Sequence, residues 1–85
     1  MANKRQDQRP RTLLRAKVVF AGGFKVIDCT VMDLTAHGAR LKKGDWLDVP
    51  DRFELRIFGG KRYMAELCYH DGVFAGVRFE RPLPP

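Results

Sequence analysis

Short apolar runs rich in β-branched residues alternate along the chain with polar turns, a pattern typical of β-strands. The run at residues 52–58, RFELRIF, shows the period of two most clearly. Phe53, Leu55 and Ile57 share one face of it, and the residues between them share the other. The pattern predicts six strands, over residues 16–21, 24–34, 39–43, 52–58, 61–70 and 73–80.

Turn signals lie close enough to these runs to connect neighbouring strands as hairpins. Gly59-Gly60 and Asp71-Gly72 are dipeptides typical of two-residue hairpin turns. No segment shows the spacing of an amphipathic helix. Short strands joined by tight turns favour an all-β fold, a small six-stranded antiparallel barrel whose closure removes exposed sheet edges.

Two segments fall outside the strand pattern. GDWLDVPD, residues 44–51, is predicted to be a loop in which Trp46 plugs one end of the barrel, because a single aromatic among Asp residues is a poor surface for an anion. The closing sequence RPLPP is expected to stop the last strand, since proline cannot extend a ladder. We therefore expect a Pro-rich tail over residues 82–85.

The composition is that of one small globular domain, with 85 residues, 45% hydrophobic and 31% charged. No apolar run is long enough to cross a membrane, and none follows the basic N-terminus as in a signal peptide. Cys29 and Cys68 lie far apart and form no CxxC pair, which favours reduced thiols packed as small hydrophobes. These features predict a cytoplasmic protein without membrane insertion.

Positive charge is concentrated at the N-terminus. The net charge is +6, and residues 1–17 supply most of it, because their only acidic residue is Asp7. Residues 1–10 are polar and have little to bury, so we expect a flexible arm there. Such an arm suits a phosphate-bearing partner. The charge alone fits a solvated tail better.

Two short motifs change this interpretation. Arg11 and Arg15 form an RxxxR sequence directly before the first predicted strand. At the end of the second run, Asp33 and Thr35 occupy alternate positions and Gly38 follows. This glycine is expected either to take a positive φ or to let another group approach the backbone closely. Asp, Thr and Gly are common turn formers, so the second motif alone carries little weight.

Taken together, RxxxR, DxTxxG at a strand end and the closing GVRFE resemble the PilZ domain family. The resemblance implies a split six-stranded barrel that binds cyclic di-GMP, a bacterial second messenger, through Arg11, Arg15, Asp33, Thr35 and Gly38. Thr35 stands where the family usually has Ser, and RPLPP stands where many members add a helix. The expected organisation is an arm at residues 1–10, a PilZ-like barrel at 11–81 and the tail at 82–85.

The chemistry of these residues fits such a ligand. An arginine fork reaches O6 and N7 of guanine and also fits phosphate oxygens, while Asp33 can accept from the N–H donors on guanine's opposite edge. We expect the arm to be a latch that the ligand orders. Arg9 is a candidate for a further contact or for holding a second, stacked nucleotide; the alternative is a solvated tail charge. Arg40 is a candidate for a contact near the site; the alternative is an outward strand charge.

The favoured function is a stand-alone cyclic di-GMP receptor that alters contact with a downstream protein, for example in motility or biofilm regulation. One alternative is a small-barrel binder of single-stranded nucleic acid, which the nearly neutral body disfavours. The other is a PilZ-like interaction domain without nucleotide binding, which the two motif arginines disfavour. No nucleophile–base pair, zinc spacing, P-loop or GxGxxG is present. We therefore expect neither enzyme activity nor a metal or cofactor.

Overall fold

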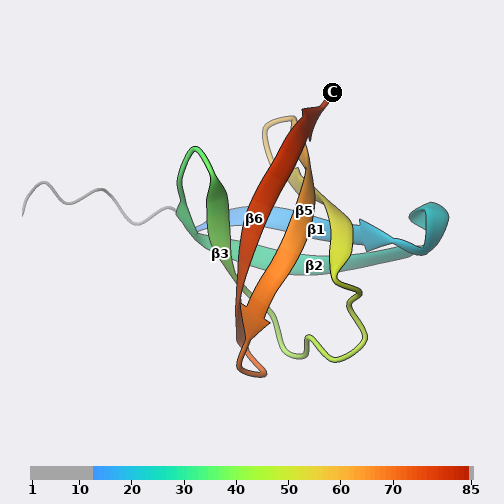
Figure 1. The fold of residues 1–85 in the computed structure, drawn as a ribbon, viewed down its shortest axis with the longest axis vertical. Helices are drawn as coiled ribbons and strands as arrows, with labels where there is room; N and C mark the ends of the chain where they lie inside the picture. Colours follow the sequence, from blue (N-terminus) through green and yellow to red (C-terminus); the bar gives the residue numbers. More distant parts are fainter. Residues whose placement is uncertain (1–12, 85) are drawn as a thin grey trace, which may run out of the picture.

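A computed structural model describes residues 13–84, and within them six antiparallel strands close into a barrel (Figure 1). The strands are β1 (Leu14–Phe20), β2 (Lys25–Leu34), β3 (Gly38–Lys42), β4 (Arg52–Ile57), β5 (Lys61–His70) and β6 (Phe74–Leu83). They pair in the order β1-β2-β3-β6-β5-β4, and β4 closes the barrel against β1. This confirms the predicted antiparallel barrel. No helix among the described residues has the length and apolar character needed to span a membrane.

Tight turns join the later strands where the glycine signals predict them. Gly59 and Gly60 connect β4 to β5 with φ angles of 106° and 107°, which favour glycine. Asp71 begins the turn between β5 and β6. Its carboxylate accepts the N–H groups of Val73 at 3.1 Å and Phe74 at 2.8 Å, and these bonds fix the turn.

The hairpin of β1 and β2 extends beyond the closed part of the barrel (Figure 1). Two strands flank this hairpin, β4 beside β1 and β3 beside β2. β4 pairs only with Ala16–Val19 of β1, and β3 pairs only with the part of β2 that begins at Thr30. The segment Lys25–Cys29 of β2 therefore pairs with β1 alone. The hairpin ends in a short 3-10 helix, η2 (Ala21–Gly23).

Alternating side chains fill the barrel. Phe53, Leu55 and Ile57 of β4 are all buried, as the period of two predicts. Trp46, in the loop between β3 and β4, is 1% exposed, and its Nε1–H donates to the carbonyl of Val73 at 2.9 Å. The indole therefore belongs to the core, as expected of a plug, and is not a surface for ligands.

The last strand is longer than predicted. β6 runs through Pro82 to Leu83, where Tyr63 and Arg62 of β5 are their partners. The predicted end of this strand at Glu80 is therefore wrong, although the strand does end within RPLPP, at Leu83. Because β3 reaches only as far as Arg78, the end of β6 has a neighbour on one side only, and proline is tolerated at such an edge. The barrel thus includes part of the predicted tail.

The two thiols differ in burial, and this difference predicts their reactivity. Cys29 lies in the core, and burial raises the pKa of its thiol to about 12, whereas Cys68 is exposed. Because the thiolate is the reactive form, we expect iodoacetamide to modify Cys68 alone in the folded protein at neutral pH, and both thiols in denaturant. Peptide mass spectrometry measures this. Equal labelling of both thiols in the folded protein would contradict the placement of Cys29.

Candidate functional site

The turn between β2 and β3 is organised by the Thr35 hydroxyl. Its Oγ1 accepts the N–H groups of His37 at 3.2 Å and Gly38 at 3.1 Å. The same hydroxyl donates to the Gly38 carbonyl at 3.2 Å, which also accepts the Thr35 N–H at 2.9 Å. The hydroxyl that the motif resemblance assigns to ligand binding therefore shapes the turn, and threonine performs this role as serine would.

Gly38 lets β3 approach β6 closely. It pairs with Arg78, and a Cβ atom at Gly38 would lie 2.2 Å from the carbonyl oxygen of Val77. The glycine does not have a positive φ, so close approach is the correct one of its two predicted roles. The Phe79 N–H donates to the His37 carbonyl at 2.7 Å and ties the turn to β6 as well.

A β-bulge sets the direction of Asp33. Val31 pairs with Leu41 and Asp33 pairs with Arg40, so Met32 is an extra residue on β2. Without the bulge, Asp33 would share the inward face of the buried Val31, two positions earlier. The bulge turns Asp33 outward, where its Oδ2 accepts the Nε–H of Arg40 at 2.8 Å.

Asp33, Thr35 and Gly38, which we call the β2–β3 corner, border a shallow surface hollow of about 460 Å³. Tyr69 of β5 lines the same hollow and pairs with Gly76 of β6. The tyrosine ring lies over this glycine, because a Cβ there would be 2.2 Å from the ring. With the ring largely exposed, the hollow combines an outward carboxylate with an aromatic surface.

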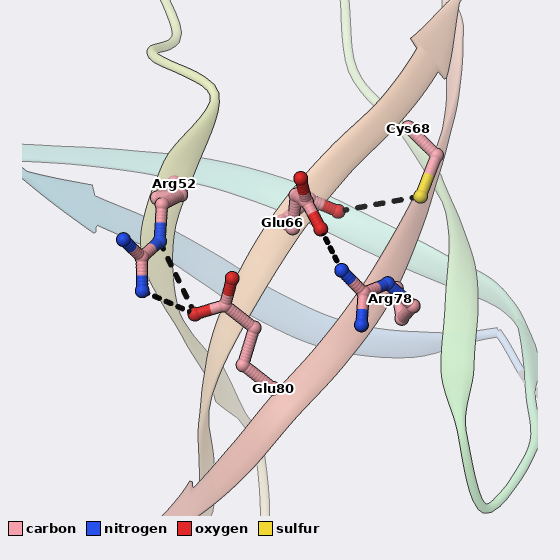
Figure 2. A network of polar contacts seen from close by, with 5 residues as sticks. All are labelled: Arg52, Glu66, Cys68, Arg78 and Glu80. Atoms are coloured by element: carbon pink, nitrogen blue, oxygen red, sulfur yellow. Dashed lines mark hydrogen bonds and ion pairs between the residues drawn. The ribbon is translucent and has the colours of Figure 1, made fainter.

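Arg78 borders the hollow from β6 and is already paired. Its Nη2 donates to the carboxylate of Glu66, next to Cys68 on β5 (Figure 2). Hydrogen bonding to Glu66 raises the pKa of Arg78. A second pair, between Arg52 and Glu80 at 2.7 Å, links β4 to β6 in the same view. The guanidinium of Arg78 is therefore already neutralised by an ion pair.

Arg15 lies on the outer face of β1 but does not line this hollow. It pairs with Thr30, whereas Asp33 lies three positions farther along β2, or about 10 Å along the strand. Arg15 lines a second, larger groove of about 1070 Å³ instead. Since Leu14 pairs with Val31, the chain enters β1 at the end of the barrel where β2 leads into the corner (Figure 1). Arg15 and the corner thus occupy neighbouring parts of one surface.

Two of the predicted binding residues, Arg9 and Arg11, lie outside the described residues, as does the rest of the predicted arm. Of the others, the structure joins Asp33 and Arg40 as an ion pair. Sequence reasoning missed Tyr69. The sequence does contain a signal for this residue, because Tyr69 lies opposite Gly76 across the β5–β6 hairpin. An aromatic residue in that position covers a glycine in the neighbouring strand.

The hollow can bind a planar polar group, because it offers carboxylate acceptors, guanidinium donors and an aromatic face. Within residues 13–84, no group of three or more His, Cys, Asp or Glu side chains is placed to hold a metal ion. Comparisons with family models, curated proteins and solved structures give no match.

Proposed function

We propose that this protein is a receptor for cyclic di-GMP that binds the messenger at the β2–β3 corner and acts without catalysis. The observation that carries the proposal is the outward carboxylate of Asp33, which the Met32 bulge places beside Arg40 in a hollow shared with Tyr69. The resemblance of RxxxR and DxTxxG to the PilZ motifs supports the same ligand.

A guanine base fits the groups at the corner. The contact between Asp33 and Arg40 joins Oδ2 to Nε, which leaves Oδ1 of Asp33 to accept from the N–H donors of guanine. The terminal nitrogens of Arg40 form a fork suited to O6 and N7 of a guanine or to a phosphate. The exposed face of Tyr69 adds stacking, worth about 1–3 kcal/mol per base at nucleic-acid sites.

The phosphates of the messenger are anionic and need cationic partners. Of the two arginines in RxxxR, Arg15 is the one that lies within the described residues. Its side chain is exposed on the outer face of β1, in the groove that adjoins the corner along β2 and β3. A ligand with two guanines and two phosphates engages both places at once, with Arg11 and Arg9 adding contacts from the predicted arm. Binding then orders the arm and changes the surface offered to a downstream protein.

Titration calorimetry with cyclic di-GMP tests the proposal. We expect saturable binding, micromolar or tighter, and a loss of about tenfold or more in Arg15→Ala, because a charge-assisted contact to the ligand is removed. Arg15→Lys should recover little of this loss, since an ammonium group cannot reproduce the planar fork. The calorimetric stoichiometry also distinguishes one bound nucleotide from a stacked pair.

The matched control is Arg81→Ala, which removes the same charge from an exposed residue that borders neither the hollow nor the groove. The affinity of this variant for cyclic di-GMP should equal that of the wild type. If the wild-type protein binds no cyclic di-GMP, or if Arg15→Ala and Arg81→Ala weaken binding equally, the proposed function is wrong.

A further inference from the structure

The larger groove is lined by residues of β4, β1, β2 and β3 and of the loops that follow β3 and β4. Strand register aligns two rows of side chains across these strands. One row runs from Arg56 through Lys17 to Asp28, and the other runs from Arg15 through Thr30 to Lys42. The volume of about 1070 Å³ exceeds that of the corner hollow, at about 460 Å³. The groove is therefore large enough to receive a segment of another molecule.

Positive charge dominates the groove. Its one acidic side chain among the described residues, Asp28, is paired with Lys17 at 2.5 Å. The hydrogen bond and the charge of Lys17 lower the pKa of Asp28, so the Asp28 carboxylate stays ionised at neutral pH. Within residues 13–84, Arg15, Lys42 and Lys43 form no salt bridge. The nearly neutral body of the protein thus presents an unbalanced cationic face.

The ends of two lysine side chains are placed against aromatic rings. Lys43 Nζ lies 5.0 Å from the ring centre of Trp46, and Lys42 Nζ lies 5.9 Å from that of Phe74. Such cation–π contacts hold the ammonium groups near the barrel while leaving their N–H donors available. The groove therefore has cations with a defined position at the end of β3.

A free sheet edge adjoins these lysines. The pairing of β3 with β2 ends where Lys42 meets Thr30, and the chain then turns away, with the Lys43 N–H bonded to the Val73 carbonyl at 3.0 Å. Lys25–Cys29 of β2 is therefore left with β1 on one side and no strand on the other among the described residues. Its backbone N–H and C=O groups can pair with an added strand.

We infer that this groove binds an extended acidic segment of a partner protein. The segment adds as a strand to the Lys25–Cys29 edge and places carboxylates at Lys42, Lys43 and Arg15. Charge complementarity favours an anionic partner, and the free edge favours a polypeptide over a nucleic acid. Phe58 is the only aromatic side chain among the described residues that line the groove, whereas single-stranded nucleic acids stack on several. The inference does not depend on binding of the messenger.

Fluorescence anisotropy with defined probes tests the inference. The first probe is a labelled peptide of alternating glutamate and threonine, about 12 residues long, which can pair as a strand. The second alternates glutamate with proline, which keeps the charge but removes half of the N–H donors. We expect the first peptide to bind, and the second to bind about tenfold or more weakly. A deoxythymidine oligonucleotide of similar length serves as the nucleic-acid probe.

Charge reversal locates the binding surface. Lys42→Glu/Lys43→Glu should weaken the glutamate–threonine peptide about tenfold or more, and Lys42→Gln/Lys43→Gln should weaken it less. The control, Lys61→Glu/Arg81→Glu, makes the same charge change at exposed positions outside the groove and should bind as the wild type does. Circular dichroism checks that each variant is folded.

The inference is overturned if the glutamate–threonine peptide does not bind, or if the glutamate–proline peptide binds as tightly. It is also overturned if both double charge reversals act equally, or if the oligonucleotide binds more tightly than either peptide. A dimer in sedimentation velocity that the glutamate–threonine peptide dissociates would assign the free edge to a second copy of this chain and would contradict the inference as well.

Discussion

Trp46→Ala is expected to lower the free energy of unfolding by about 3–5 kcal/mol, as replacement of a large buried aromatic residue does. The indole is 1% exposed, packs near Phe53 with 6.4 Å between ring centres, and donates to the Val73 carbonyl. The loss approaches the whole stability of a small domain, about 5–15 kcal/mol. Urea unfolding measures this loss of stability. It is followed by circular dichroism and not by tryptophan fluorescence, because the variant lacks the chain's single tryptophan.

Leu47→Ala is the matched control, since Leu47 follows in the same loop but is 79% exposed. Its effect should stay within about 0.5 kcal/mol, as for surface substitutions in general. If the two variants unfold at the same urea concentration, Trp46 does not hold the loop to the core and the description of the barrel end is wrong.

Gly38→Ala has the second large expected effect, a loss of about 1–3 kcal/mol from forcing a methyl group into a packed contact. The new Cβ would lie 2.2 Å from the Val77 carbonyl oxygen, so β3 and β6 must separate locally. Because the obstacle is backbone, a change of rotamer cannot relieve it. Thermal unfolding of the variant and the wild type gives the loss.

Gly44→Ala provides the comparison for this prediction. A Cβ at Gly44 meets no atom within 4 Å, and its φ is not positive. We expect the free energy of unfolding to be unchanged or slightly raised, because alanine restricts the unfolded chain. Equal destabilisation by the two substitutions would show that the contact of Gly38 with β6 is not what requires a glycine there.

The sequence predicts the barrel well because its strands obey local rules. In β4, the alternation of Phe53, Leu55 and Ile57 with polar residues matches their burial. The hairpin dipeptides fix where β4, β5 and β6 meet, since Gly59 and Gly60 take φ values that other residues avoid. Each of these signals depends only on neighbours along the chain.

Features that depend on pairing between strands distant in the sequence cannot be predicted from local patterns. Alternation alone would direct Asp33 inward, and only the pairing of β2 with β3 reveals the Met32 bulge that turns it outward. Pro82 remains in a strand because β3 stops at Arg78 on the other side of β6.

The cationic groove escapes sequence reasoning for a similar reason. The body of the protein is nearly neutral in total, and the fold brings Lys42, Lys43 and Arg15 to one groove in which Asp28 is the one acidic residue among those described. A count of charges along the chain cannot show this segregation, because it arises from strand order.

Binding of cyclic di-GMP at the corner is tested most directly by titrating the ¹⁵N-labelled protein with the messenger and following backbone amide signals by NMR. The account predicts saturable shifts at Arg15, Asp33, Gly38 and Tyr69, with Phe24 at the far hairpin unchanged. An unchanged spectrum at high messenger concentration, or shifts confined to the hairpin around Phe24, would contradict it.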